Sequence, residues 1–321
     1  MPKTRYHNVD NVSTDKTLKE FRQWREERRL KKKDYSYVVP NTPPRLSYLS
    51  ENRLESTITW IGHSTFFLQY EGINIITDPI WARRLGFEKR LGQPGIPLSE
   101  VPPIDLILIS HSHYDHLHIA SIRKLYRAAT TLVVPVGLKR KMLRKGFHNC
   151  MEMEWWQEIK LGKIKLTFVP TQHWTRRTPW DTNTSHWGGY ILEPAESEKQ
   201  RFSPNLYFAG DSGYFPGFKE IGSRYKIDIA LMPIGAYEPE WFMTSQHVNP
   251  EEAIQAFLDV GAETMIPMHY GTFRLADDTA REALDRMESA RVKHGISENR
   301  IRTLSYGETL VVQSENRTSG Q

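Results

Sequence analysis

The chain has a single cysteine and no long hydrophobic run. Of its 321 residues only Cys150 is a cysteine, so neither an intrachain disulfide nor a cysteine-based zinc site can form. No apolar stretch is long enough to span a membrane, and residues 1–15 are polar and lack the apolar core of a signal peptide. We therefore expect a globular protein of a reducing compartment, with the cytoplasm as the default location.

The body of the chain also lacks a net charge. Residues 1–58 contain 13 Lys and Arg against 8 Asp and Glu, which accounts for the whole net charge of +5, and the rest of the chain contains 30 of each kind. A neutral body offers no basic footprint for nucleic acid, so we expect no nucleic-acid partner. We expect a basic extension over residues 1–57, one domain over 58–312 and a polar tail over 313–321.

Within the extension, residues 16–33 have the pattern of a basic amphipathic helix. Four apolar side chains recur at roughly helical spacing among many basic ones: Leu18, Phe21, Trp24 and Leu30. Such a helix would lie on an anionic membrane, giving peripheral association at its inner face. Alternatively it packs Phe21 and Trp24 on the main domain, as ordinary surface helices do, and we favour this second interpretation.

The most informative feature is the run His-Ser-His-Tyr-Asp-His at residues 111–116. It follows a nearly continuous apolar run at residues 104–109, which is typical of a strand buried on both faces. Imidazoles and a carboxylate lose hydration when they are buried and must find partners. Because neutral imidazole and carboxylate together suit zinc, iron or manganese, the run predicts a metal site at the end of a strand.

Three further apolar strands end in a metal-binding residue type. Residues 164–169 lead to His173, residues 206–209 to Asp211, and residues 264–268 to His269. With the four ligands of the 111–116 run they make seven candidate protein ligands. One tetrahedral zinc needs only three protein ligands and a water, so seven indicate two metals that share a bridging ligand.

This order of ligands resembles that of the metallo-β-lactamase superfamily. The resemblance implies an α/β (α+β) fold, a four-layer αββα sandwich, with opening hairpins at residues 58–77 and helices at 251–258 and 279–294. It assigns His111, His113 and His173 to the first metal, Asp115, His116 and His269 to the second, and Asp211 to the bridge. His63 lies in a Gly-His-Ser-Thr turn and is expected to be structural or to support a ligand without binding the metal, since the seven positions are filled.

Further motifs between residues 58 and 308 resemble the N-acylphosphatidylethanolamine-hydrolysing phospholipase D family. Among them are Trp60–Thr65, Thr77–Ile80, Gln172–Trp174, Gln246–Val248 and His269–Phe273. The resemblance implies a dinuclear zinc hydrolase that cleaves a phosphodiester of a phospholipid or another small molecule through a metal-bridging hydroxide. Asp115, Asp211 or a water molecule would accept the released proton. His247, on a loop before the helix start Asn249-Pro250, would contact the substrate or, alternatively, pack that loop.

The sequence says less about which residues contact the substrate and what the substrate is. Five residues near the expected mouth are candidates for substrate contact: Tyr237, Glu238, Trp180, Trp241 and Phe242. A lactonase, or a sugar-phosphate or cyclic-phosphate hydrolase, on the same metals is an alternative, because the same nucleophile attacks carbonyl carbon. A non-enzymatic protein that binds membranes peripherally is the remote alternative. All seven ligands being present argues against it.

Overall fold

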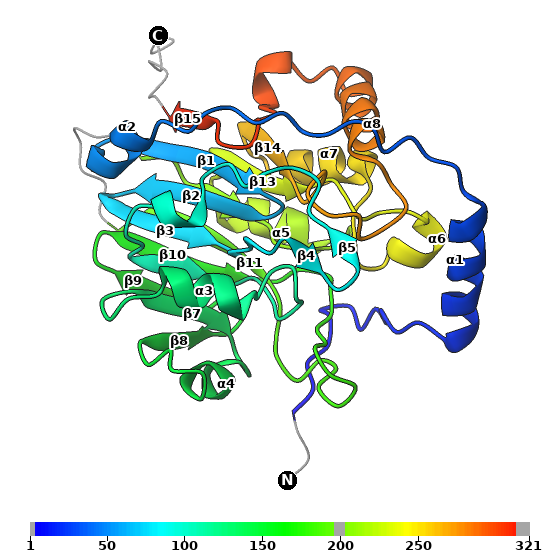
Figure 1. Ribbon diagram of the computed structural model, residues 1–321, viewed down its shortest axis with the longest axis horizontal. Coiled ribbons are helices and arrows are strands. Elements are labelled where there is room, and N and C mark those ends of the chain that lie inside the picture. The colour runs from blue at the N-terminus through cyan, green and yellow to red at the C-terminus, as the bar shows by residue number, and fades with distance from the viewer. Residues whose placement is uncertain (1–3, 196–202, 313–321) are drawn as a thin grey trace.

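The central strands of this protein bury both of their faces, because the two large sheets form the middle layers of a four-layer molecule (Figure 1). The computed structural model describes residues 4–195 and 203–312. Seven strands form one sheet in the order β15-β1-β2-β3-β6-β7-β8, six form a second in the order β14-β13-β12-β11-β10-β9, and β4 and β5 form a separate hairpin. The strands are β1 Ser56–Gly62, β2 Thr65–Tyr70, β3 Ile73–Thr77, β4 Arg84–Leu85, β5 Glu88–Lys89, β6 Leu106–Leu108, β7 Thr131–Pro135, β8 Cys150–Met153, β9 Glu158–Leu161, β10 Ile164–Val169, β11 Gly189–Pro194, β12 Leu206–Phe208, β13 Ile229–Pro233, β14 Thr264–Met268 and β15 Thr309–Val312.

Helices cover the outer face of each sheet. The α-helices are α1 Leu18–Leu30, α2 Leu46–Glu51, α3 Ile119–Leu125, α4 Lys139–Leu143, α5 Gly217–Arg224, α6 Glu240–Met243, α7 Pro250–Asp259 and α8 Ala280–Lys293, with short 3-10 turns at Leu98–Glu100 and Glu298–Arg300. Side chains of α2, α3 and α4 pack in one core cluster with the seven-stranded sheet, and those of α5, α7 and α8 pack with the six-stranded sheet. The expected αββα sandwich is therefore confirmed.

Side chains that alternate along each strand belong to two separate hydrophobic cores, one between the sheets and one under the helices of the seven-stranded sheet. In β6, Leu106 and Leu108 point into the core between the sheets, whereas Ile107 joins the cluster under α3. Phe66 and Phe67 of β2 divide in the same way. Side chains alternate between the faces of a strand, so a strand with a sheet on one side and helices on the other must be apolar throughout. This is why residues 104–109 read as a continuous apolar run.

Strand direction determines where the functional residues gather. In the first sheet β1 and β2, and β2 and β3, are antiparallel, and β3 pairs in parallel with β6. The carboxyl ends of β1, β3 and β6 therefore lie at one edge. In the second sheet the same reasoning brings together the ends of β10, β12 and β14. Both sets of strand ends carry the polar residues that the sequence marks as ligands.

The N-terminal segment runs along one side of the domain, and α1 lies beside α6 (Figure 1). Helix α1 begins with a capping box in which Thr17 and Glu20 exchange hydrogen bonds, inside the range expected from the sequence. Strand β15 pairs with β1 and closes the seven-stranded sheet. The expected polar tail, residues 313–321, lies outside the described residues. Within the described ranges, no helix has the length and apolar character needed to cross a bilayer.

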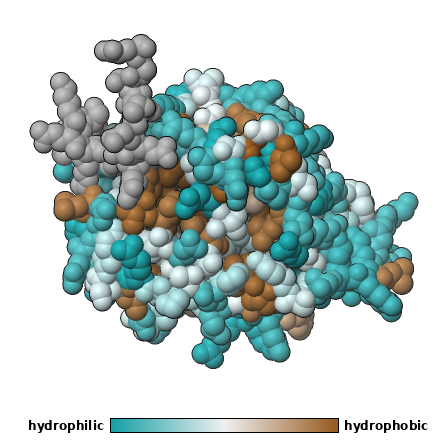
Figure 2. All heavy atoms as spheres, turned by 90° about the horizontal axis from the view of Figure 1, so that it is seen from above, coloured by the Kyte–Doolittle hydropathy of each residue, from teal (hydrophilic) through white to brown (hydrophobic). Residues whose placement is uncertain are grey.

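Hydrophilic side chains cover most of the face shown in Figure 2, and the hydrophobic ones on it form separate patches. Several large apolar side chains are nevertheless well exposed. The most exposed are Leu18, Leu30, Leu54, Phe87 and Trp180. Single exposed hydrophobic residues are normal on protein surfaces, so each of these needs a second observation before it indicates a contact.

Candidate metal centre

The loop after β6 carries the densest set of candidate ligands and is held from outside by one arginine. Its backbone turns at His113, whose carbonyl accepts from the N–H of Leu117 at 2.8 Å. Arg177 Nη1 donates to the carbonyls of Ser112 at 2.8 Å, His113 at 3.3 Å and Leu117 at 2.8 Å. The guanidinium also lies 3.9 Å from the centre of the Tyr114 ring. One side chain therefore fixes the loop at three carbonyls, a contact that the sequence did not reveal.

The three histidines expected at the first metal lie together. His113 Nδ1 is 2.9 Å from His111 Nε2 and 3.1 Å from His173 Nε2. Burial lowers the pKa of His113 to about 3 and that of His173 to about 4, and it holds the pKa of His111 well below its usual value. All three imidazoles are therefore neutral at neutral pH, the form that binds a metal ion. The second ring nitrogen of His173 contacts the carbonyl of Gln246 at 2.9 Å, which fixes the ring.

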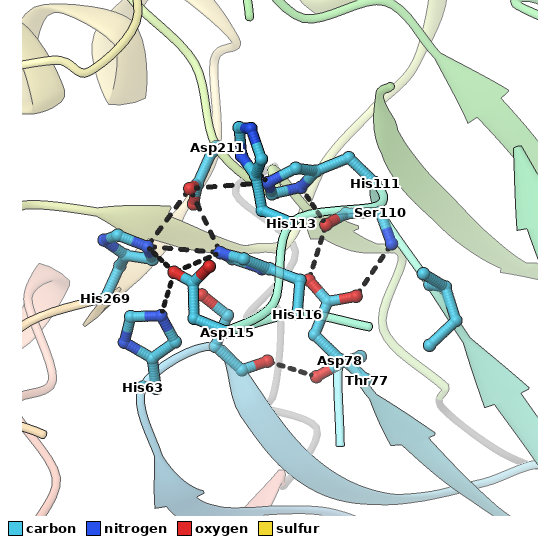
Figure 3. A network of polar contacts seen from close by, with 12 residues as sticks. His63, Thr77, Asp78, Ser110, His111, His113, Asp115, His116, Asp211 and His269 are labelled. Atoms are coloured by element: carbon cyan, nitrogen blue, oxygen red, sulfur yellow. Dashed lines mark hydrogen bonds and ion pairs between the residues drawn. The ribbon is translucent and has the colours of Figure 1, made fainter. Parts of the chain in front are cut away.

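The residues expected at the second metal also meet. Asp115 Oδ2 lies 3.2 Å from His116 Nε2 and 3.6 Å from His269 Nε2, and the two histidine nitrogens are 3.2 Å apart. His63 Nε2 is 2.9 Å from the same carboxylate oxygen, so this group has four members. The ring of His63 faces this group and lies as close to it as a metal ligand would (Figure 3). The expectation that His63 does not bind the metal therefore stays a prediction.

We call His111, His113 and His173 the first group, and Asp115, His116 and His269 the second group. The second group contains charged side chains, whereas the three histidines of the first are neutral. Burial opposes the charged form of both its ligand histidines, but the Asp211 and Asp115 carboxylates outweigh it. They raise the pKa of His269 to about 9 and that of His116 well above its usual range. Conversely, burial favours the neutral acid, yet the neighbouring histidines hold the pKa of Asp115 and Asp211 well below the usual range. Without metal, these histidines are protonated at neutral pH.

Asp211 lies between the two groups. Its Oδ2 is 3.1 Å from both His116 Nε2 and His269 Nε2, 3.8 Å from His111 Nε2 and 3.9 Å from His173 Nε2. Its other oxygen is buried and has no hydrogen-bond partner. A carboxylate that faces ligands of both groups has the position expected of a bridging ligand.

Asp78, which follows β3, supports ligands of both groups and is absent from the predicted set. Its Oδ2 lies 2.7 Å from His116 Nδ1 and accepts a hydrogen bond of 2.5 Å from Ser110 Oγ. Ser110 Oγ is in turn 2.8 Å from His111 Nδ1. Figure 3 shows this chain of contacts behind the ligands. A carboxylate on the far nitrogen of a ligand histidine fixes its tautomer and orientation. The signal was present, because β3 is another apolar strand that ends in a polar residue.

Three residues of this edge hold unusual backbone conformations. His63, Asp78 and His269 have φ values of 55°, 33° and 63°, in the left-handed region that residues other than glycine rarely adopt. Such positions cost of the order of 1–3 kcal/mol each and persist only where the surroundings enforce them. Here His63 N–H donates to Thr272 Oγ1 at 2.6 Å, and His269 N–H donates to the His63 carbonyl at 3.2 Å.

His247 stands at the border of the two groups. Its Nδ1 is 4.0 Å from Asp211 Oδ2 and is buried without a hydrogen-bond partner. The ring centre lies 5.1 Å from that of His173 and 5.4 Å from that of His269. Burial holds the pKa of His247 well below its usual value. As expected, Asn249 caps α7 and Pro250 is its first residue, which places His247 on the loop before that helix.

The proposed substrate residues do not all reach this cluster. Tyr237 is fully buried with Arg286 over its ring, and Glu238 pairs with Lys33 at 2.9 Å. Phe242 is buried, with the ring of Trp24 stacked on it at 5.4 Å between centres. Only two of the five candidates remain open to solvent: Trp180, 78% exposed, and Trp241, 43% exposed.

The N-terminal extension is part of the site's surroundings. Asn8 Oδ1 accepts from the backbone N–H of His173 at 3.0 Å and from Trp187 Nε1 at 3.1 Å, so a residue of the extension bonds the backbone of a ligand. Three of its cations pair with acidic residues of the body: Arg28 with Asp277 at 3.3 Å, Lys31 with Glu238 at 3.4 Å and Lys33 with Glu282 at 2.7 Å. Trp24 is packed as the second interpretation of α1 expects, whereas Phe21 remains 43% exposed.

Comparison with known proteins gives a consistent result. Residues 73–270 match a family described as the beta-lactamase superfamily domain. An N-acyl-phosphatidylethanolamine-hydrolyzing phospholipase D of Caenorhabditis elegans is 36% identical over 233 residues, 67% of this chain and 64% of that protein. The chain thus spans less than two thirds of that relative. A UPF0173 metal-dependent hydrolase of Methanopyrus kandleri is 32% identical over 219 residues, 67% of this chain and 84% of that protein.

Solved structures share the fold. Igni18, a metallo hydrolase from the archaeon Ignicoccus hospitalis, superposes with a TM-score of 0.60 at 23% identity, covering 80% of this chain and 98% of the other. An isothiocyanate hydrolase from Delia radicum gut bacteria superposes with a TM-score of 0.65 at 17% identity, covering 80% of this chain and 99% of the other. At such identities the likeness concerns the fold alone.

Proposed function

This chain belongs to the metallo-β-lactamase superfamily and is a metal-dependent hydrolase, and we propose that it uses two zinc ions. We propose further that the bonds it cleaves are phosphodiesters. The observation that carries the proposal is the position of Asp211 between two groups of ligands. His111, His113 and His173 would hold one ion, Asp115, His116 and His269 the other, and Asp211 would contact both.

The donor atoms fit such a centre. Neutral imidazoles and ionised carboxylates are the forms that bind zinc, and the first group has them at neutral pH. Asp211 Oδ1, the second oxygen of the carboxylate between the two groups, is buried and has no partner in the protein. Buried polar atoms without a partner are rare and call for an explanation, and a bound metal provides one.

Two divalent ions at such a site supply a nucleophile from water near neutral pH and stabilise negative charge on a phosphoryl group. The chain's own residues would do the rest. His247 would orient the substrate and hold a proton at Nδ1, the atom that faces Asp211 Oδ2. Asp115 or Asp211 would accept the proton released from water. Burial of His247 and Asp211, with Asp115 partly buried, limits the competition of bulk water for these hydrogen bonds.

For the substrate we propose an N-acylphosphatidylethanolamine-like phospholipid. The support is the worm relative, whose name gives that substrate, together with exposed Trp180 and Trp241, which offer an acyl chain apolar surface. Burial of such surface is worth about 25 cal/mol per Å². We propose further that the protein works in the cytoplasm and reaches its substrate from the inner face of a membrane, with Leu18 and Phe21 of α1 contacting lipid.

Metal analysis and one variant test the centre. We expect two equivalents of zinc per chain, and we expect Asp211→Asn to lose both hydrolysis and part of the metal. A zinc content well below two equivalents, or an Asp211→Asn protein with full activity, would overturn the dinuclear centre. Thermal denaturation of the variant checks that it is folded.

A substrate panel tests the reaction. N-acylphosphatidylethanolamine, bis-p-nitrophenyl phosphate and an acyl-homoserine lactone are compared at equal enzyme concentration. We expect turnover of both phosphodiesters. Lactone turnover without phospholipid turnover would reject the proposed substrate and favour the lactonase. For membrane contact, Leu18→Ser with Phe21→Ser is compared with Leu54→Ser in vesicle co-sedimentation, since Leu54 is exposed but lies outside α1. Equal binding would reject a role for α1.

A further inference from the structure

A second region of the surface concentrates positive charge without negative charge. Beside the β4–β5 hairpin lies a cleft of about 890 Å³ whose lining includes Arg83, Arg84, Lys89 and Arg90. Among the described residues, none with a carboxylate lines it. This segment belongs to the part of the chain after residue 58, in which cations and anions are equal in number. Four cations around one cleft are therefore a local concentration and do not follow from the composition of the body.

The hairpin places two of these cations directly opposite each other. Arg84 and Lys89 are cross-strand partners in the antiparallel pair. Like charges at this position destabilise a hairpin, so the sequence keeps a repulsive pair here. The only acid of the hairpin, Glu88, is 3.6 Å from Arg28 of α1, so its charge is engaged with the extension. An anion between Arg84 and Lys89 would remove the repulsion.

Arg90 contributes a fixed positive charge. Its guanidinium donates to the carbonyls of Gly92 at 3.1 Å, Ile80 at 3.1 Å and Ile61 at 3.2 Å. Burial lowers the pKa of Arg90 to about 10, and no carboxylate in the described part of the chain forms an ion pair with it. Carbonyl groups hold a guanidinium in place without neutralising it. A half-buried charge that lacks a counter-ion attracts an anion more strongly than a fully hydrated one does.

The cleft also has apolar elements. The Trp81 ring lines it and is held by a hydrogen bond of 2.8 Å from Nε1 to the Ile96 carbonyl. Leu98 is a further lining residue. Phe87, at the tip of the hairpin and outside the lining, is 98% exposed. Cationic and apolar groups side by side suit a phosphate that carries an organic group better than they suit a bare polyanion.

The cleft is close to the candidate metal centre but separate from it. Arg90 bonds the carbonyl of Ile61, two residues before His63, and Leu91 N–H donates to the Thr272 carbonyl at 2.9 Å, three residues after His269. None of the seven candidate metal ligands lines the cleft. An occupant would thus contact the backbone that supports the loops of His63 and His269.

We propose that this cleft binds a phosphate-bearing anion, either the headgroup of an anionic phospholipid or a soluble phosphate. The Arg84 and Lys89 side chains would contact the phosphate oxygens, and Arg90 would supply the fixed charge beneath them. The proposal does not depend on the hydrolytic function, because no metal ligand takes part.

The test uses the whole 321-residue chain loaded with zinc and a variant of two exposed cations, Arg84→Ala with Lys89→Ala. The matched control, Arg144→Ala with Lys145→Ala, removes the same charge from exposed positions after α4. One arm measures inorganic phosphate binding by calorimetry. The other measures binding to phosphatidylcholine vesicles in which one lipid in five is phosphatidylglycerol. Each cation near an anionic surface contributes about fivefold to partition, so we expect the cleft variant to bind vesicles roughly 30-fold more weakly than the control.

The outcomes separate the two sources. Loss of vesicle binding only in the cleft variant identifies a lipid headgroup, and loss of phosphate binding only in that variant identifies a soluble phosphate. If the cleft and control variants behave alike in both arms, the cleft is not an anion site and the proposal is overturned. Asp211→Asn is run in parallel and should keep the cleft's binding even if hydrolysis is lost. Failure of the proposed function would therefore leave this result unchanged.

Discussion

Replacing Asp78 by asparagine isolates the support behind the ligands. The substitution keeps the size of the side chain and the acceptor for Ser110 N–H, which lies 2.7 Å from Oδ1. It puts an NH2 group at the position of Oδ2, where the carboxylate faces His116 Nδ1 at 2.7 Å and Ser110 Oγ at 2.5 Å. An amide NH2 donates and does not accept, so the orienting contact on His116 is lost.

The size of the effect follows from these contacts. A hydrogen bond to a charged group contributes about 1.5–3 kcal/mol, and 1.4 kcal/mol is a factor of ten, so one lost bond corresponds to about 10–100-fold in zinc affinity. The same range is typical of outer-shell carboxylates on metal-bound histidines. The loss should fall mainly on the group of Asp115, His116 and His269, because His111 keeps its contact with Ser110.

Competition with a chromophoric chelator measures both zinc affinities. Asp105→Asn is the matched control, since Asp105 precedes β6 at the opposite edge of the same sheet and bonds the Asn74 N–H at 2.8 Å. Thermal denaturation tests whether each variant is folded. A folded Asp78→Asn protein that binds zinc as tightly as Asp105→Asn would refute the argument that Asp78 orients the ligands.

Three further predictions concern the surroundings of the centre. Arg177→Ala should weaken zinc binding about tenfold, because three loop carbonyls lose their common donor, and Arg177→Lys should restore part of it; equal affinities measured by chelator competition would contradict this. His269, with a pKa of about 9, and His116, whose pKa is also raised, must each release a proton when metal binds, so the zinc affinity of the second group should rise by more than tenfold per pH unit from neutrality and less steeply above about pH 9. The affinity of the first group should stay flat over that range, since its histidines are already neutral, and parallel pH profiles would rule this out. Asn8→Ala should lower zinc affinity through the lost acceptor of the His173 N–H, by about 1 kcal/mol or more, whereas the exposed Asn11→Ala should not; calorimetric zinc titrations compare the two.

Local patterns in the sequence predicted the strand ends and the seven candidate ligands, whereas the four-layer fold was expected from the family resemblance. Each apolar strand has a detectable end, and a histidine or aspartate placed there is visible without knowing the partner strand. The strand order was not available from such patterns. It comes from long-range pairing, such as β3 beside β6 and β15 beside β1. Thus the convergence of His173, Asp211 and His269 rested on a resemblance, and the parallel directions of their strands give its physical reason.

The supporting residues were missed for a different reason. Arg177 lies in a polar loop and acts on backbone carbonyls, which leave no mark in the sequence. Asn8 lies in residues 1–57, which were expected to be an extension outside the domain because they hold the whole net charge. It nevertheless accepts a hydrogen bond from the backbone N–H of His173. Glu238 was considered for substrate contact, and its partners are instead Lys31 and Lys33, far away in sequence. Contacts across long sequence separations are not encoded in local periodicity.

The strained residues show how the fold prepares the site. His63, Asp78 and His269 follow three different strands, and each has a positive φ that its residue type disfavours. Their backbones are nevertheless fixed by hydrogen bonds: Asp78 N–H to the Leu108 carbonyl at 2.9 Å, His269 N–H to His63, and His63 N–H to Thr272. Local preference and final conformation disagree here, as is typical of functional sites. Because these hydrogen bonds fix the backbones of the ligand His269 and of Asp78 and His63 beside the ligands, less of the free energy of metal binding is needed to arrange the site.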